Sequence, residues 1–322
     1  MDRSSTRTRA GGYDRKSAVR KVKSDSGSRR VRGERAGYPS PRLLLEKYGL
    51  RAKKSWGQNF LGDEEILDHI ARLAVEAAGE RVVELGAGLG HLTARLLARG
   101  AAVIAVERDR DLAAVLRGEL GETVQLIEGD AARLDYRPLA CGGKLVVVGN
   151  LPYHLTSPIL FGLLDQVDLV ARAVFLLQRE VAQRLAAKPG TKDWGLLSVL
   201  LQYRAEVSLE RRVPAGAFLP PPKVESALIR IGFGPPRTPV SDERRFRRLV
   251  KAGFAQRRKV LANSLAAAGI APEEQLAGAL ATAGIDARRR GETLTVEEWA
   301  ALDRALGPTG MRDKPAVQGG EG

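Results

Sequence analysis

The stretch KLVVVGNLPYHLTSP, residues 144–158, places an amide and an aromatic ring directly after an apolar run. The four apolar residues before the glycine predict a buried strand. Asn150 follows, and an amide oxygen accepts hydrogen bonds from an exocyclic amine. Pro152 holds Leu151 extended and leaves the Leu151 carbonyl as a second acceptor, while a base can stack on Tyr153 for about 1–3 kcal/mol. The stretch predicts a site that holds a base amine and leaves its lone pair free.

A glycine-rich loop, VVELGAGLGHLTARL, follows an earlier apolar strand and precedes a helix. At the carboxyl end of a strand, Gly86, Gly88 and Gly90 would let the backbone approach a ligand closely. Their spacing differs from the Gly-x-Gly-x-x-Gly of a site that holds a pyrophosphate. Glu107 ends the second strand, where an acid can accept hydrogen bonds from the ribose hydroxyls of a nucleoside. Asp130 ends the third strand, where it can face the adenine amino group of the same nucleoside. This nucleoside site without a diphosphate fits S-adenosylmethionine, and a nicotinamide cofactor fits it poorly.

The other face of a target base needs a second aromatic ring. A base inside a helix cannot be reached, so the target nucleotide must be unpaired or flipped out. Phe218 is the candidate, because three consecutive prolines follow it closely and a strand from Val224 lies behind it. An ordinary core phenylalanine before a Pro-rich turn is the alternative that stays open.

Short apolar strands alternating with amphipathic helices must position these residues. We expect strands at 81–85, 102–107, 124–130, 144–150 and 172–177, helices at 91–100, 110–120, 157–167 and 179–188, and a β-rich end at 224–233. Asp63 is expected to cap an earlier helix whose apolar stripe includes Ile66, Leu67, Ile70 and Leu73. The alternation predicts an α/β fold, a Rossmann-like parallel sheet with helices on both faces.

Composition divides the chain into four segments. We expect a disordered basic tail at 1–42, an α/β domain at 43–236, a small helical domain at 237–306 and a disordered end at 307–322. The linker GFGPPRTPVSDE marks the boundary between the two domains. The small C-terminal domain is expected to be entirely helical.

The net charge of +14 and the pI of about 10.2 indicate a polyanionic partner. Residues 1–35 hold 12 Lys/Arg against 4 Asp/Glu, so most of the excess lies in the tail. A nucleic-acid-binding arm, a solubilising tail and an organelle transit peptide are the three readings of this segment.

Other features exclude several classes of protein. The single cysteine, Cys141, rules out an internal disulfide and makes a cysteine-based metal site improbable. The three histidines (His69, His91 and His154) lack helical ligand spacing, so we expect no metal. No apolar run approaches the roughly 18 residues of a membrane span. We therefore expect a cytoplasmic protein with no membrane association.

Eight motifs in order resemble the ribosomal RNA adenine N6,N6-dimethyltransferase family over about residues 53–306. They are GQNFLGD, VVELGAGLGHLT, VERD, EGDA, GNLPYHLTSPIL, LLQREVAQRL, FLPPPKVESALIRI and FAQRRKVLANSL. The resemblance implies a Rossmann-like class I methyltransferase sheet, with an S-adenosylmethionine-dependent methyltransferase domain at 43–236 and an RNA-binding helical domain at 237–306. It implies dimethylation by S-adenosylmethionine of two adjacent adenines, in a loop near the 3′ end of small-subunit ribosomal RNA, during biogenesis of that subunit. It implies cofactor contacts at Asn59, Leu61, Gly86, Glu107, Asp130 and Asn150. Residues 150–153 would also hold the target adenine.

Two alternatives share these motifs. One is the branch that methylates large-subunit RNA and confers macrolide resistance, although QRRKVLANSL matches the small-subunit branch better. The other is a non-catalytic assembly or transcription factor on this fold, against which the intact Asn-Leu-Pro-Tyr and glycine loop argue. Two residues depart from the family pattern: Ala87 replaces a common proline, and His154 replaces a common asparagine. We interpret His154 as a neighbour of the site, because the chemistry needs no strong base.

Basic residues at the start of the helical domain are expected to contact RNA phosphates. They are Arg244, Arg245, Arg247, Arg248, Arg257, Arg258 and Lys259. Few acids intervene among them, which favours phosphate contact over a solvated helix face. The expected partner is the small ribosomal subunit with its ribosomal RNA, bound by a monomer.

Overall fold

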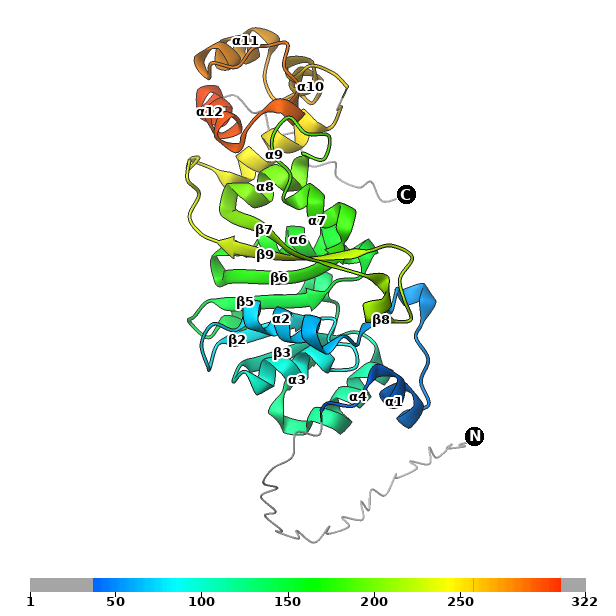
Figure 1. Cartoon of the computed structure of the whole chain (residues 1–322). Coiled ribbons are helices and arrows are strands. Elements are labelled where there is room, and N and C mark those ends of the chain that lie inside the picture. The colour runs from blue at the N-terminus through cyan, green and yellow to red at the C-terminus, as the bar shows by residue number, and fades with distance from the viewer. Residues whose placement is uncertain (1–36, 257, 308–322) are drawn as a thin grey trace, which may run out of the picture. The chain divides into compact units, whose positions relative to one another are not determined.

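The computed structural model describes residues 37–307 except position 257. Within these residues, a seven-stranded sheet has the strand order β4-β3-β2-β5-β6-β9-β7 (Figure 1). Its strands are β2 (Arg81–Leu85), β3 (Ala102–Glu107), β4 (Gln125–Glu128), β5 (Leu145–Asn150), β6 (Val170–Gln178), β7 (Ala205–Val213) and β9 (Ser226–Phe233). The first five strands of that order are parallel, and β9 is antiparallel to both β6 and β7. The predicted Rossmann-like sheet is confirmed, with two antiparallel strands added at one edge.

Helices cover both faces of this sheet. Along the described residues the helices are α1 (Pro41–Lys47), α2 (Glu64–Ala74), α3 (His91–Ala98), α4 (Arg110–Leu120), α5 (Arg137–Ala140), α6 (Thr156–Leu164), α7 (Arg179–Leu185), α8 (Leu196–Arg204), α9 (Glu243–Phe254), α10 (Leu261–Ala267), α11 (Glu273–Thr282) and α12 (Val296–Leu306). Of these, α9 to α12 form a C-terminal group that packs on α8 (Figure 1). Successive strand residues point to opposite faces. Val83 and Leu85 therefore pack in one core with α6, whereas Val82 packs in a second core with α2 and α3. Burial on both faces explains why these strands are apolar throughout.

The starts of two helices fix turns that matter for the site. The Asp63 carboxylate accepts a hydrogen bond from the backbone N–H of Ile66 at 3.0 Å, which confirms the predicted cap of α2. Asp109 caps α4 by accepting from the N–H of Asp111 at 3.1 Å. Each cap gives a partner to an amide that the helix itself leaves without one.

The sequence prediction lacks α8 and β7. β7 is an edge strand, so alternate residues are exposed and Val213 is its one buried residue. Its sequence AEVSLERRV has no apolar run, and a register shift between Leu209 and Arg211 breaks the alternation further. The strand expected from Val224 begins instead at Ser226, because Val224 lies exposed in the preceding loop.

A separate two-stranded sheet joins distant parts of the chain. β1 (Phe60–Leu61) pairs antiparallel with β8 (Phe218–Leu219), and Leu61 lies opposite Phe218. The N–H of Gly62 also donates to the Ala217 carbonyl at 2.9 Å. The blue N-terminal segment thus reaches the Pro-rich segment near β8 (Figure 1).

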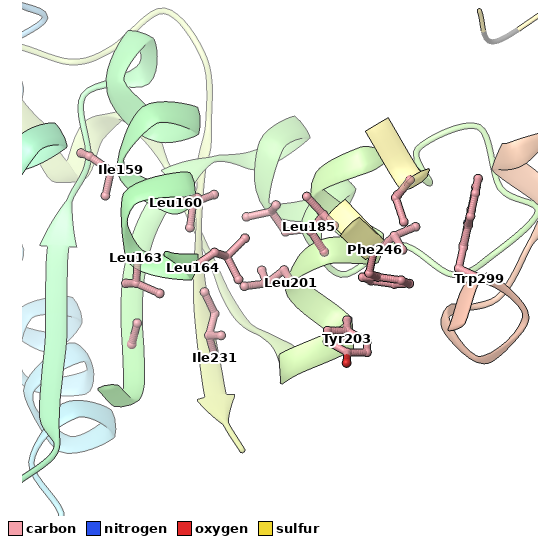
Figure 2. Close-up of a cluster of buried hydrophobic side chains, with 14 of the residues drawn as sticks. Ile159, Leu160, Leu163, Leu164, Leu185, Leu201, Tyr203, Ile231, Phe246 and Trp299 are labelled. Carbon is pink, nitrogen blue, oxygen red and sulfur yellow. The ribbon is translucent and has the colours of Figure 1, made fainter. Parts of the chain in front are cut away.

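The C-terminal helices share a core with one face of the sheet. Figure 2 shows Phe246 of α9 beside Tyr203 of α8, with ring centroids 4.5 Å apart, in a cluster that also contains Trp299 and Leu164. This single cluster crosses the expected domain boundary at residue 236, so the boundary stays a prediction.

The predicted tails fall mostly outside the structure. Residues 1–36 and 308–322 are not among the described residues, while Pro41 and Arg42 of the expected N-terminal tail belong to α1. No helix in the described part of the chain is long and apolar enough to cross a membrane.

Candidate active site

A cavity of ≈ 380 Å³ opens at the carboxyl ends of the parallel strands. It lies where β2 is flanked by β3 on one side and β5 on the other, the position at which open α/β sheets bind ligands. Its lining includes these residues of the predicted cofactor site: Asn59, Leu61, Gly86, Gly88, Glu107 and Asp130. From the predicted target-base group it is lined by Asn150, Leu151, Pro152, Tyr153 and Phe218. The fold therefore brings both groups into one cavity.

Gly90 does not lie in this cavity, and its prediction as a cofactor contact is wrong. A side chain built at Gly90 would come within 2.5 Å of the Tyr38 hydroxyl and 3.0 Å of Leu116. The residue precedes α3 with a φ of 86°, a conformation that favours glycine. Gly90 therefore leaves room for Tyr38 and Leu116 just before the start of α3.

The Glu107 carboxylate joins the glycine loop to the end of β3. It accepts hydrogen bonds from the backbone N–H groups of Gly88 and Asp109, each at 2.8 Å. Burial raises the pKa of Glu107, and these N–H groups act in the opposite direction. Each carboxylate oxygen still has a second lone pair. The side chain can therefore accept further hydrogen bonds from hydroxyl groups of a ligand.

A second carboxyl group, Glu84, is buried at the end of β2. The Thr93 hydroxyl donates to it at 2.6 Å. Burial raises the pKa of Glu84 to about 8, with a further rise from the negative charge of Glu107 and an opposing effect of the Thr93 hydrogen bond. Glu84 is therefore mainly protonated at neutral pH, so the cavity wall carries less negative charge than its three carboxyl groups, Glu84, Glu107 and Asp130, suggest.

The amide of Asn150 is oriented by the N-terminal loop. Its Nδ2 donates to the Asn59 backbone carbonyl at 3.0 Å. In the described part of the chain, Oδ1 has no hydrogen-bond partner. Since the nitrogen end of the amide is occupied, the oxygen is left to accept from a ligand, which is the role that the sequence suggested.

The turn after Asn150 presents an aromatic ring. The N–H of Leu151 donates to the Leu176 carbonyl at 3.1 Å, and the N–H of Leu155 donates to the Pro152 carbonyl at 2.9 Å. These bonds fix a short helical turn, η4 (Tyr153–Leu155), that begins at a half-buried Tyr153 on the cavity wall. The side chain of His154 lies outside what the structure describes.

Phe218 reaches the cavity because β8 pairs with β1. It is buried, and it packs in the same core as Leu61 and Ala217. Phe218 is thus both a core residue and a cavity residue, so the two readings of its sequence context are compatible.

Sequence reasoning missed the residue that anchors the N-terminal loop. Asp109 accepts hydrogen bonds from Lys53 Nζ and Gln58 Nε2, each at 2.7 Å. Burial would raise the pKa of Asp109, but the hydrogen bonds from Lys53 and Gln58 outweigh it and lower the pKa. The signal was present in the motif VERD, where a second acid follows Glu107 closely. Asp109 thereby holds the loop that carries Asn59 against the end of β3.

The predicted RNA face is smaller than the sequence suggested. Arg245 is buried in a hydrogen-bonded ion pair with Asp303 at 2.7 Å, so its prediction as an RNA contact is wrong. The Arg247 side chain pairs with Asp165 and donates to the Leu164 carbonyl. The remaining described members, Arg244, Arg248, Arg258 and Lys259, are exposed, and Arg257 lies outside the described residues.

Comparison with known proteins identifies similar chains over nearly the same span. A family model described as ribosomal RNA adenine dimethylase matches residues 49–305. Ribosomal RNA small subunit methyltransferase A of Anaeromyxobacter dehalogenans is 68% identical over 280 residues, covering 84% of this chain and 99% of that protein. The protein of the same name from Myxococcus xanthus is 54% identical over 271 residues, covering 84% and 96%.

Two solved structures share the fold. A dimethyladenosine transferase from Plasmodium falciparum superimposes with a TM-score of 0.65 at 24% identity, covering 77% of this chain and 97% of that one. The 23S rRNA methyltransferase ErmE superimposes with a TM-score of 0.60 at 27% identity, covering 77% and 99%.

Proposed function

Because the chain belongs to the ribosomal RNA adenine dimethylase family, we propose that it dimethylates the N6 amino groups of two adjacent adenines in small-subunit ribosomal RNA, with S-adenosylmethionine as methyl donor. Membership of the family by itself implies an enzyme, a ribosomal RNA substrate and a donor of the S-adenosylmethionine type. The observation that carries the finer proposal is the orientation of Asn150, whose amide oxygen faces no partner among the described residues.

The cavity fits the proposed donor. Gly86 has a φ of 71°, and no atom lies within 4 Å of the position that a side chain there would take. The backbone can therefore approach a nucleoside without obstruction. Glu107 and Asp130 both line this cavity. Glu107 would supply acceptors for the ribose hydroxyls of the donor, and Asp130 would accept from its adenine amino group. When bound, S-adenosylmethionine supplies an electrophilic methyl group on a positively charged sulfur.

The residues of the chain then orient the target amine. Asn150 Oδ1 and the Leu151 carbonyl accept the two N6 hydrogens, which leaves the nitrogen lone pair free. Tyr153 and Phe218 hold the two faces of the base. Since the donor is already reactive, positioning supplies most of the rate. The proton released from N6 after transfer passes to water, so no strongly basic side chain is required.

The second transfer requires a pocket that tolerates a methyl group. After the first transfer only one N6 hydrogen remains, so one of the two acceptors loses its partner. The apolar side chains of Leu151, Tyr153 and Phe218 supply a surface against which the new methyl can lie. The same site can therefore dimethylate a single adenine.

The small subunit is the better supported substrate. The relatives named for that subunit are 54–68% identical to this chain, whereas the ErmE structure, named for 23S RNA, is 27% identical. An adenine in a loop is partly unstacked already, which lowers the cost of flipping it. We propose that the protein acts as a monomer in the cytoplasm, where small subunits are assembled.

RNA phosphates would be bound by the exposed cations Arg244, Arg258 and Lys259. The salt slope is the slope of the logarithm of the binding constant against the logarithm of the salt concentration, and it increases in magnitude with the number of phosphate contacts. Each lost contact lowers its magnitude by about one. Substituting Arg258 and Lys259 with alanine is therefore expected to lower the slope by about two. Lys144→Ala, which removes an exposed lysine just before the start of β5, at the end of that strand away from the cavity, is the matched control and should leave the slope unchanged.

The test of the function is a methyl-transfer assay on unmethylated small ribosomal subunits with labelled S-adenosylmethionine. Mass spectrometry of the RNA is expected to find N6,N6-dimethyladenosine at two adjacent positions with the wild-type protein and none with Asn150→Ala. Methylation of large subunits only would transfer the assignment to the macrolide-resistance branch. Binding without transfer to either subunit would indicate the non-catalytic alternative.

A further inference from the structure

An exposed tryptophan stands at the mouth of the cavity. Trp56 belongs to a short helical turn, η1 (Lys54–Trp56), in the loop that Asp109 anchors. The residue lines the cavity and is 40% exposed. The other two tryptophans of the chain, Trp194 and Trp299, are both 0% exposed. Tryptophan is enriched at interfaces, where one end of the ring is apolar and the other is in water. A half-exposed tryptophan that lines a ligand cavity is therefore placed to contact a ligand.

Positive charge surrounds this ring. The Arg108 guanidinium lies 5.2 Å and Lys53 Nζ 5.5 Å from the ring centroid, both within the range of cation–π contacts. Lys53 is neutralised by Asp109 and Asp111. Arg108 and the exposed Lys54 have no carboxylate partner in the described part of the chain. The mouth of the cavity therefore combines an aromatic face with unneutralised cations.

That combination suits a nucleic-acid strand better than the methyl donor. Proteins bind single strands by stacking bases on aromatic rings and by placing cations along the phosphates. S-adenosylmethionine carries its own positive sulfonium, which nearby cations repel. The donor would be held at the Glu107 carboxylate, which is buried, whereas Trp56 is partly exposed to solvent.

We propose that Trp56 is a stacking platform for a nucleotide of the RNA loop that flanks the target adenine, with Lys54 and Arg108 contacting its phosphates. This inference rests on the proposed RNA substrate and adds a contact that lies outside the target-base pocket. The flanking base would stack on the exposed part of the ring while the target base enters between Tyr153 and Phe218. Trp56 would then help to hold the loop open at the cavity.

The first test uses the fluorescence of the full-length protein. Because Trp194 and Trp299 are buried, acrylamide should quench Trp56 selectively. A hairpin RNA with two adjacent loop adenines is expected to protect Trp56 from acrylamide, whereas S-adenosylmethionine alone is expected to leave the quenching unchanged. Trp56→Phe should abolish the protectable signal. Protection by S-adenosylmethionine alone would assign the ring to the cofactor and overturn the proposal.

The second test measures affinity for two hairpins of equal charge. One has ordinary nucleotides beside the adenines, and the other has abasic nucleotides at those positions. Trp56→Ala is expected to weaken binding of the ordinary hairpin about fivefold to a hundredfold and to leave binding of the abasic hairpin unchanged. Lys54→Ala should weaken both hairpins and lower the salt slope by about one, with Lys144→Ala as its control. Equal effects of Trp56→Ala on both hairpins would refute stacking.

Two further measurements separate this inference from the proposed function. Trp56→Phe keeps an aromatic ring, so its affinity should lie between those of the wild type and Trp56→Ala. Both variants should bind S-adenosylmethionine as the wild type does, by calorimetry, which also shows that they fold. If Trp56→Ala binds the hairpin normally and the wild type methylates small subunits, the stacking role of Trp56 is refuted and the proposed function stands. A wild type that methylates no subunit would refute the proposed function instead.

Discussion

Replacing Glu84 with glutamine should change how the stability of the protein depends on pH. The pKa of Glu84 is raised from 4.5 to about 8 because the carboxyl group is buried at the end of β2. Between these values the folded protein holds a proton that the unfolded chain has released. The free energy of unfolding therefore falls as pH rises through this window, by up to about 1.4 kcal/mol per pH unit.

Across pH 5 to 8 the loss amounts to about 4 kcal/mol, an order-of-magnitude figure from the same slope. Glutamine has the shape of the protonated acid, and its carbonyl can still accept from the Thr93 hydroxyl. We therefore expect Glu84→Gln to be about as stable as the wild type near pH 5 and several kcal/mol more stable near pH 8. Urea unfolding of both proteins at four pH values measures this difference.

Glu65→Gln is a suitable control. In the wild type, a hydrogen bond from Arg211 lowers the pKa of Glu65. The contribution of the ionised Glu65 to the free energy of unfolding is therefore lost only as pH falls below 4.5. The difference between Glu65→Gln and the wild type should therefore be constant between pH 5 and 8. If the difference for Glu84→Gln is constant as well, Glu84 is ionised in the folded protein and the argument from burial is wrong.

Three further predictions concern the site and its support. Asn150→Ala should lower turnover by about a hundredfold or more with little change in cofactor affinity, whereas Glu107→Ala should weaken cofactor binding roughly 10- to 150-fold by calorimetry; the opposite pattern would exchange their roles. Gly90→Ala should cost about 2–4 kcal/mol in thermal unfolding because of its positive φ and the contact with Tyr38, and a stability equal to wild type would contradict that packing. Arg245→Ala should lower the free energy of unfolding by about 3–5 kcal/mol, because it leaves Asp303 buried without its partner. An unchanged stability together with a lower salt slope of RNA binding would show instead that Arg245 contacts RNA.

The amino-acid sequence by itself predicts the frame of the site. The alternation of apolar strands and amphipathic helices is a local pattern, and in a parallel sheet it places every strand end at one edge. Glu107 and Asn150 end β3 and β5, so their meeting with the loop at Gly86 follows from strand periodicity alone. The fold class, the place of the cavity and the residues that line it from the strand ends were predictable for this reason.

Tertiary structure decided how individual side chains are used. The Asn150 amide is oriented by the Asn59 carbonyl, 91 residues away in the chain, and Arg245 is buried by Asp303, 58 residues away. Gly90 lies against Tyr38 because the N-terminal segment packs just before the start of α3, where the Tyr38 hydroxyl donates to the Leu89 carbonyl. Edge strand β7 carries no apolar run, so its place in the sheet depends on pairing with β9. Local spacing sets which residues reach an edge, but long-range packing sets which atoms of those residues remain free.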